Sequence, residues 1–283
     1  MVDEGRAVAV VLKFLGALAG FYALLTLVLT LAQTSLLFPR WAMGPGVMLP
    51  EGAERLQVTR EEGVVLHGQL LRAPDGAARP VVLGFGGNAW DAGAVSLYLR
   101  QLLPDHDVAS FHFRGYAPST GRPSAAALKA DALAVHDHLQ DVLGPRALVA
   151  VGFSIGAGPA AHLAAYRGLA GVVLVTPFDS LTAVARGHYP WLPVRWLFRH
   201  PMEPAADLTG AGVPVALIRA ARDSIIPPTH AWALEAALAD ARPGVVFSQE
   251  IDAGHNDIYD RADFQDALRA AIRRIEEQGE RAR

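Results

Sequence analysis

An apolar segment near the start of the chain shows no polar face. Residues 14–32 read FLGALAGFYALLTLVLTLA and contain no charged side chain. At about 1.5 Å per helical residue this segment extends about 28 Å, close to the ~30 Å hydrocarbon core of a bilayer. Lys13 stands at its start, where a long side chain can reach the lipid headgroups. The pattern predicts a transmembrane helix over about 14–32, within a membrane anchor formed by residues 1–35.

The charges around this segment predict its orientation. Arg6 and Lys13 precede it and only Arg40 follows closely, so the positive-inside rule favours a cytoplasmic N-terminus and an external or periplasmic body. A cleaved signal peptide is the alternative, because Thr30 and Ala32 place small residues near the −3 and −1 positions of a cleavage site. The apolar run is longer than most signal sequences have, which favours an uncleaved anchor.

From residue 54 onward, apolar runs alternate with helical patterns. The runs lack strict polar–apolar alternation, which is typical of strands buried on both faces of a parallel sheet. The first two runs precede any helix and are expected to pair antiparallel at an edge. The pattern predicts an α/β fold with a mostly parallel eight-stranded sheet. The runs are ERLQVTRE, VVLHGQLL, PVVLGFGG, DVASFHFR, RALVAVGFS, LAGVVLVTPF, PVALIRAARD and VVFSQEID. The predicted helices are Ala92–Leu103, Ser124–Leu143, Ile155–Tyr166, Pro228–Ala239 and Asp260–Glu277.

Residues 36–283 are predicted to form one domain, since no internal repeat, low-complexity tract or linker divides them. Residues 179–207 break the alternation with four prolines and an aromatic cluster around 189–198. An irregular insertion after a strand is typical either of a lid over a site or of a packed surface loop. The sequence leaves both open.

Composition narrows the function classes. The 283 residues include 25 basic and 28 acidic side chains, which leaves no electrostatic footprint for nucleic acid. The absence of cysteine excludes disulfides, thiolate catalysis and Cys-ligated metal sites, and it leaves the compartment open. A mean hydropathy of +0.24 is high for a soluble protein, and the anchor accounts for it.

A serine lies where an apolar strand runs into a helical pattern. Residues 147–158 read ALVAVGFSIGAG, and a serine at such a sharp strand-to-helix turn is typical of a nucleophile elbow. Gly152 and Gly156 are expected to be glycines because side chains there would collide across the turn. The alternative for Ser154 is an ordinary helix N-cap.

Two later strands end in residues that would complete a catalytic triad. A serine hydroxyl needs a base and an acid that orients the base, and the order Ser, Asp, His at strand ends matches Ser154, Asp223 and His255. Asp207 and Asp257 are alternative acids, less favoured because of their positions in the chain. The other histidines show no metal-ligand spacing, so neither a metal nor a cofactor is predicted.

An acyl-transfer enzyme also needs backbone amides to stabilise the oxyanion. The amide of Ile155, after the nucleophile, is one candidate. The segment Gly84–Trp90, GFGGNAW, follows the third strand, and Asn88 is the candidate for the second amide. A generic glycine turn is the alternative.

These motifs resemble the α/β-hydrolase fold, and within it a membrane-anchored branch described as serine aminopeptidase-like or alpha/beta hydrolase domain-containing. The resemblance covers nearly the whole chain and rests on SLLFPR, FGGNA, FRGYAPSTGRPS, GFSIGAG, TPFDSL, ARDSIIPP and AGHND. The branch usually has F-H-G-N-A where this chain has Gly86 in place of the histidine. That histidine normally supports the oxyanion loop by hydrogen bonding, so its loss weakens the expected support without removing an amide donor.

The motifs predict a membrane-tethered serine hydrolase that cleaves ester or thioester bonds of a small or lipid-like acyl substrate through an acyl-enzyme. Two alternatives remain: a peptidase with the same triad, as the branch name implies, and a catalytically silent binding protein with this fold. An intact Ser154, Asp223 and His255 set argues against the silent protein. The partners predicted are an acyl substrate and, through the N-terminal helix, the membrane; protein partners are not readable from the sequence.

Overall fold

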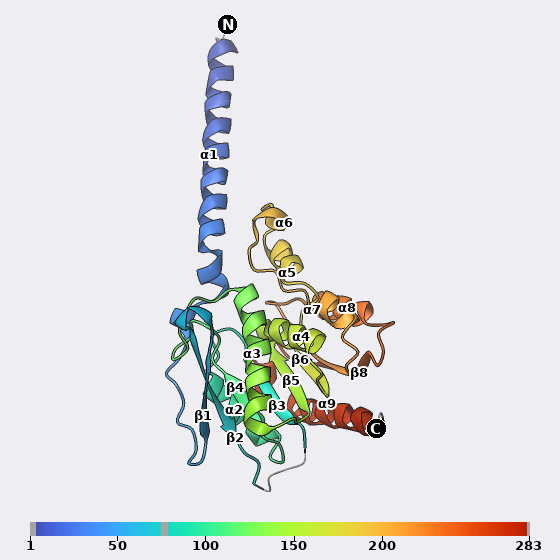
Figure 1. Cartoon of the computed structure of the whole chain (residues 1–283). Helices are drawn as coiled ribbons and strands as arrows, with labels where there is room; N and C mark the ends of the chain where they lie inside the picture. The colour runs from blue at the N-terminus through green and yellow to red at the C-terminus, as the bar shows by residue number, and fades with distance from the viewer. Residues whose placement is uncertain (1–3, 75–78, 282–283) are drawn as a thin grey trace.

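Eight strands form one sheet in the computed structural model, which describes residues 4–74 and 79–281 (Figure 1). The strand order is β1-β2-β4-β3-β5-β6-β7-β8, with β2 antiparallel to β1 and β4 and every other pair parallel. All eight predicted runs are strands, and the expected antiparallel pair lies at one edge. The strands are β1 Glu54–Thr59, β2 Val65–Leu71, β3 Val81–Phe85, β4 Val108–Phe111, β5 Leu148–Phe153, β6 Gly171–Val175, β7 Val215–Ala220 and β8 Val245–Ile251.

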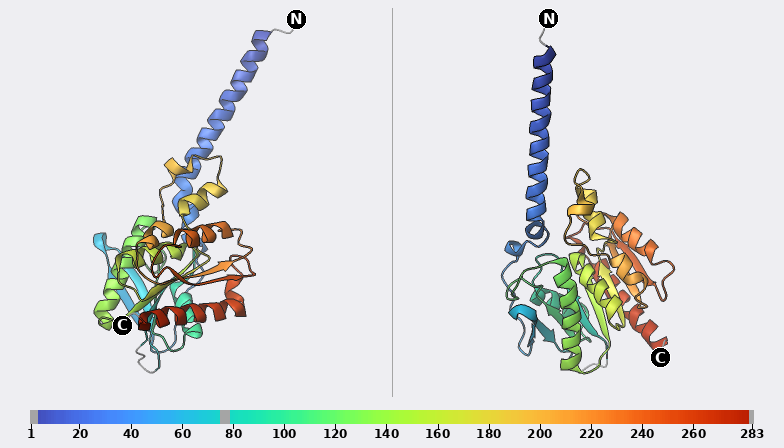
Figure 2. Two further views of the ribbon diagram at one scale, coloured as in Figure 1. Left: turned by 90° about the vertical axis from the view of Figure 1, so that its right-hand side faces the viewer. Right: turned by 45° about the horizontal axis from the view of Figure 1, so that its top comes forward.

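Helices cover both faces of the sheet (Figure 2). Every residue of β3, β5 and β6 is buried, because alternate side chains enter two separate cores. In β5, Leu148 and Ala150 belong to one core, whereas Val149, Val151 and Phe153 belong to the other. This two-sided burial is the reason for the continuous apolar runs in the sequence. One core includes α3 Ala125–Leu143, α4 Ala157–Tyr166 and α8 Pro228–Ala237, and the other α2 Ala92–Leu102 and α9 Ala262–Arg281.

The predicted helices are present with small changes at their ends. Asp91 caps α2 and Ser124 caps α3, each accepting from a backbone amide three residues on. The predicted helix over 155–166 starts as a 3-10 turn, Ser154–Gly156, and becomes α-helical at Ala157. The last helix continues to Arg281, beyond the predicted end at Glu277.

The segment 179–207 contains three short helices that the sequence patterns did not predict. They are α5 Leu181–His188, α6 Val194–Leu197 and α7 Pro204–Thr209. The prolines in this segment argue against helices when the sequence alone is considered. Pro204, however, occupies the first turn of α7, where a backbone N–H has no partner within the helix and its loss costs nothing. This segment therefore contains regular helices, whereas the sequence predicted an irregular insertion.

Helix α1, Glu4–Leu37, projects from the body of the protein (Figures 1 and 2). Its most apolar stretch has a mean hydropathy of 2.1 and is not buried in the protein. Among the described residues it is the one helix long and apolar enough to cross a membrane, judged by length and composition. At its C-terminal end the chain enters the body, where Phe38 is 2% exposed and part of the core.

Candidate active site

Ser154 lies at the tight turn between β5 and α4. Its φ of +51° is in the left-handed region, which residues with a Cβ rarely adopt. The turn presents the side chain at the C-terminal end of the central parallel strands, where ligands of such sheets usually bind. Ser154 is therefore held in a strained conformation by the strand before it and the helix after it, as in a nucleophile elbow.

The two glycines of this turn are required for different reasons. A Cβ on Gly152 would lie 2.6 Å from the carbonyl oxygen of Gly156 and 2.8 Å from the Cα of Ala157. A Cβ on Gly156 would collide with the carbonyl of Phe85 and lie 2.7 Å from the carbonyl oxygen of Gly86. The expected collision across the turn thus applies to Gly152. Gly156 is required because the loop after β3 passes directly over it.

His255 and Asp223 meet Ser154 at the ends of β8 and β7. Nε2 of His255 lies 2.9 Å from Oγ of Ser154, and Nδ1 lies 2.6 Å from Oδ2 of Asp223. The other carboxylate oxygen of Asp223 accepts from the amides of Ile225 at 2.9 Å and Ile226 at 2.7 Å. All three side chains are at most 9% exposed. The structure thus brings the three sequence-predicted residues into one hydrogen-bonded chain.

The two alternative acids have other partners. Asp257 accepts from the amide of Gly254 at 2.8 Å, within the loop that carries His255. Asp207 lies 3.5 Å from the ring of His162, on the helices behind the sheet. Within residues 4–74 and 79–281, no group of three or more His, Asp or Glu side chains is arranged to hold a metal ion.

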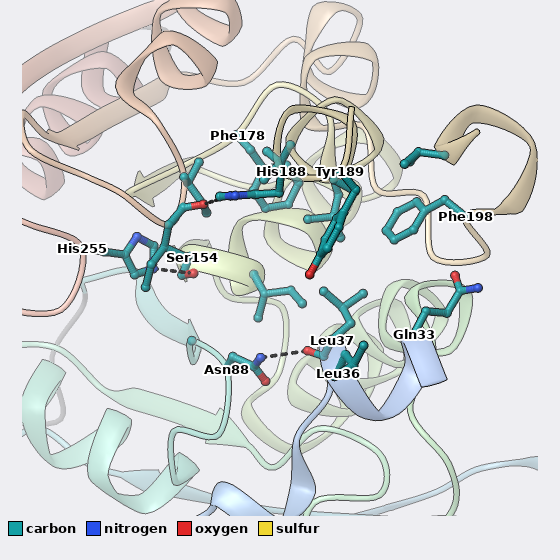
Figure 3. A pocket seen from close by; sticks show the side chains of 18 of the residues that line it. Gln33, Leu36, Leu37, Asn88, Ser154, Phe178, His188, Tyr189, Phe198 and His255 are labelled. Carbon is teal, nitrogen blue, oxygen red and sulfur yellow. Dashed lines mark hydrogen bonds between the residues drawn. The ribbon is translucent and has the colours of Figure 1, made fainter. Parts of the chain in front are cut away.

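The loop after β3 runs alongside Ser154. A Cβ on Gly87 would lie 3.7 Å from the Cβ of Ser154, and Asn88 and Ile155 border the same cavity as the serine. The Asn88 side chain donates to the carbonyl oxygen of Leu37, at the end of α1, at 2.8 Å (Figure 3). It also accepts from the hydroxyl of Tyr116 at 2.9 Å. The structure therefore brings both candidate amide donors close to Ser154.

Comparison with family models gives no match. Among curated proteins, the chain is 35% identical over 231 residues to an uncharacterized protein of Mycobacterium tuberculosis, covering 78% of this chain and 79% of that protein. It is 29% identical to the lysophosphatidylserine lipase ABHD12 of Danio rerio, covering 53% of this chain and 45% of the lipase. It is also 27% identical to an uncharacterized membrane protein of Saccharomyces cerevisiae, covering 77% and 81% of the two chains.

Solved structures share the architecture. The esterase Pf2001 of Pyrococcus furiosus superposes with a TM-score of 0.66 at 18% identity, covering 82% of this chain and 98% of the esterase. An alpha-beta hydrolase of Vibrio vulnificus superposes with a TM-score of 0.59 at 19% identity, covering 82% and 80%. The chain belongs to the α/β-hydrolase family.

In this α/β hydrolase, aromatic packing occupies the space beside Gly86. A Cβ on Gly86 would lie 3.1 Å from Cγ2 of Val95 and 3.5 Å from the Cβ of Trp90. Even the Cβ of a histidine at this position would therefore require Val95 to move by a few tenths of an ångström. The Trp90 ring contacts Phe153, Tyr259 and Tyr98, with centroid separations of 5.1, 5.2 and 5.8 Å. The loop is held by this packing and by the Asn88 side chain instead of by the usual histidine.

Tyr259 joins this aromatic cluster to the triad. Burial raises the pKa of its hydroxyl to about 12, the neighbouring Thr176 hydroxyl opposes the rise, and the charge of Asp223 adds to it. The phenol therefore stays neutral and presents an apolar ring to the site. Tyr259, the packing of Trp90 and the bonds of the Asn88 side chain were not predicted from the sequence. The one signal in the sequence was a bulky Trp90 four residues after the glycine that replaces the histidine.

A cavity of about 660 Å³ opens over the triad (Figure 3). Ser154 and His255 form its base, and most of its walls are apolar. No side chain of Asp, Glu, Lys or Arg lines it within the part of the chain that the structure describes. Its walls come from the loops after β3, β6, β7 and β8, from residues 181–200, called here the α5–α6 segment, and from the last turns of α1.

Proposed function

We propose that this α/β hydrolase is a membrane-tethered serine hydrolase that cleaves carboxylic ester or thioester bonds of lipid-like acyl substrates. The observation that carries the proposal is the chain of hydrogen bonds from Asp223 through His255 to Ser154 at the base of an apolar cavity. A buried carboxylate, an imidazole and a strained serine in this order form the arrangement that activates a serine hydroxyl.

In the first half of the reaction, Oγ of Ser154 forms a bond to the carbonyl carbon of the substrate, and its proton moves to Nε2 of His255. The carbonyl π electrons move to oxygen, and the resulting oxyanion accepts hydrogen bonds from the backbone amides of Ile155 and Asn88. The carbon–oxygen or carbon–sulfur bond then breaks. The leaving group takes the proton from His255 and departs as an alcohol or thiol, and the acyl group remains on Ser154.

In the second half, water replaces the leaving group. His255 accepts a proton from the water as its oxygen bonds to the acyl carbon, and the same amides hold the second oxyanion. The bond to Oγ breaks, the proton passes from His255 to Ser154, and the carboxylic acid leaves. Throughout both steps the Asp223 carboxylate keeps a proton on Nδ1 and stabilises the imidazolium.

The cavity lining favours an acyl chain over a peptide. An aminopeptidase needs a negative group that binds the substrate's terminal ammonium, and no carboxylate lines the cavity among the described residues. The lipase ABHD12, a relative of this chain, supports an ester of a lipid. A catalytically silent binding protein does not require a serine in a strained conformation that is hydrogen-bonded to a histidine.

Tethering is supported by α1. The most apolar stretch of this 34-residue helix is not buried in the protein and needs an environment of lipid, and the yeast relative is described as a membrane protein. We keep the orientation expected from Arg6 and Lys13, with the body external. Protease protection in sealed vesicles tests that orientation, and recovery of mature protein starting at Gln33 would identify a cleaved signal instead.

Labelling with a fluorophosphonate probe tests the chemistry. The wild-type protein should be labelled, and Ser154→Ala should abolish labelling while the thermal melt stays cooperative. Ser110→Ala, at a serine that is 1% exposed and lies outside the cavity lining, is the matched control and should label normally. Undiminished labelling of Ser154→Ala would refute the assignment.

A panel of p-nitrophenyl esters beside aminoacyl p-nitroanilides tests the substrate class. We expect turnover of the esters and none of the anilides above background. Preferential cleavage of the anilides would establish the peptidase instead. Absence of both activities, together with absence of labelling, would establish the binding protein.

A further inference from the structure

One face of α1 packs against the α5–α6 segment. The hydroxyl of Tyr22 donates to the carbonyl oxygen of Trp191 at 2.8 Å, and the two rings meet edge to face with centroids 6.3 Å apart. Eleven residues further along α1, Gln33 contacts the same segment again. The partly buried positions between them, 25, 26, 29, 30 and 32, follow the spacing of one helix face. The contact therefore runs along the C-terminal half of the predicted span.

Backbone hydrogen bonds fix the register of this contact. Nε2 of Gln33 donates to the carbonyl oxygen of Leu197 at 3.1 Å, and its Oε1 accepts from the amide of Arg199 at 2.8 Å. The Arg199 guanidinium donates to the carbonyl oxygen of Thr30 at 2.7 Å. Thr34 and His200 lie 2.8 Å apart, between Oγ1 and Nε2. Bonds to the main chain on both sides hold α1 and the segment as one unit.

The same face of α1 is a wall of the catalytic cavity. Leu29, Thr30, Gln33, Leu36 and Leu37 line it together with Ser154 (Figure 3). Leu36 is 59% exposed and lies where α1 meets the surrounding medium, whereas Leu29 is partly buried. A helix that is apolar enough to cross a bilayer thus borders the cavity that contains the nucleophile.

The depth of the contact can be derived from the helix rise. Ten residues separate Tyr22 from Ala32, the end of the predicted span, which at about 1.5 Å each is about 15 Å. That is about half of a ~30 Å hydrocarbon core, or one leaflet. The α5–α6 segment carries the exposed aromatic residues Tyr189, Trp191 and Trp196, and Trp191 contacts Tyr22 at this depth.

We propose that α1 and the α5–α6 segment stand together in one leaflet and form the acyl-binding site, so that the acyl chain of a lipid in that leaflet reaches Ser154 through the cavity that both of them line. The occupant is an acyl chain because the cavity is apolar, carries no charged lining group among the described residues and borders the bilayer-spanning helix. The inference rests on the proposed ester hydrolysis for what happens to the bound lipid, whereas binding of the acyl chain does not depend on that reaction.

Tryptophan substitutions on two faces of α1 test the wall. Leu29→Trp and Leu36→Trp place a ring in the cavity wall, whereas Leu31→Trp places the same ring on a face that is 66% exposed and outside the lining. The full-length variants are placed in phosphatidylcholine vesicles with p-nitrophenyl palmitate or acetate. We expect the palmitate-to-acetate rate ratio to fall at least tenfold for the two wall variants and to stay within twofold for Leu31→Trp. An unchanged ratio in the wall variants, or an equal fall in all three, would refute the proposal.

Photo-crosslinking tests binding without the chemistry. Full-length Ser154→Ala is placed in vesicles that contain phosphatidylcholine with a diazirine in its acyl chain, irradiated and digested for mass spectrometry. We expect adducts on residues 29–37 and 184–198, weakened by Leu36→Trp and not by Leu31→Trp. Adducts in a chain whose wild type hydrolyses no ester would reject only the proposed function. Ester hydrolysis without adducts in the cavity lining would reject only the acyl-binding site.

Discussion

Replacing Asp223 by asparagine preserves the shape of the side chain and reverses the direction of its hydrogen bond with His255. One carboxylate oxygen accepts from the amides of Ile225 and Ile226, and the other faces Nδ1 of His255. In Asp223→Asn the amide oxygen must face the two backbone donors, because the opposite orientation would set NH₂ against two N–H groups. The NH₂ group then faces Nδ1 and can only donate to it.

This reversal forces the wrong tautomer on His255. With Nδ1 accepting, the neutral ring carries its proton on Nε2, and it donates to Ser154 instead of accepting the serine proton. The loss of an oriented general base of this kind lowers kcat by as much as about 10⁴ in triad hydrolases. At about 1.36 kcal/mol per tenfold change, that corresponds to about 5.4 kcal/mol of transition-state stabilisation. Because no side chain in the cavity changes, KM is expected to stay within a few-fold.

Steady-state kinetics on p-nitrophenyl acetate measure both constants, with circular dichroism to show that the variant is folded. Asp257→Asn and Asp207→Asn are the matched controls, since neither carboxylate contacts His255. Both are expected to retain kcat within about threefold. Near-normal turnover of a folded Asp223→Asn protein, with a large loss in either control, would move the role of the acid to that residue.

Three further outcomes follow from contacts around the site. Gly156→Ala should fail to give a stably folded, active protein, because the new Cβ meets the backbone of Phe85 and Gly86; a normal thermal melt would contradict this. Trp90→Ala should cost about 3 kcal/mol of unfolding free energy and lower kcat on the acetate ester more than it raises KM, whereas an unchanged kcat would show that the loop needs no aromatic support. Burial and then the charge of Arg199 lower the pKa of His200, whose Nδ1 has no hydrogen-bond partner among the described residues. The unfolded chain therefore binds the proton more tightly than the folded chain. The free energy of unfolding, measured by urea titration, should fall as the pH drops below the pKa of about 6.5 that histidine has in the unfolded chain. His200→Gln should show a smaller fall over the same pH range.

The sequence predicts most of the scaffold because the relevant signals are local. A strand such as β5 is buried on both faces, so its apolar run is continuous and bounded by turn residues, and all eight strands could be recognised in this way. The candidate triad followed from motif order at three strand ends, which requires no knowledge of packing. The roles of Ser154, Asp223 and His255 stay predictions that the labelling and kinetic experiments test.

Contacts between distant parts of the chain could not be predicted. Gln33 and Leu197 are 164 positions apart, and nothing in the composition of either segment indicates that they meet. The sequence shows that Trp90 is bulky, but it does not show that Trp90 packs against Tyr98, Phe153 and Tyr259, which lie in three other parts of the chain. Helices α5 and α6 are too short and too rich in neighbouring prolines to give a periodic signal.

The hydrogen bond from Asn88 to the carbonyl of Leu37 has a practical consequence for purification. A soluble fragment that starts at β1 would lose that acceptor, the buried Phe38 side chain and one wall of the cavity together. Its kinetics would then differ from those of the intact enzyme even on a water-soluble ester, where location in a membrane is irrelevant. Detergent or nanodisc preparations of the whole chain are therefore the appropriate material for substrate screening, and inactivity of a trimmed fragment says little about the activity of the whole chain.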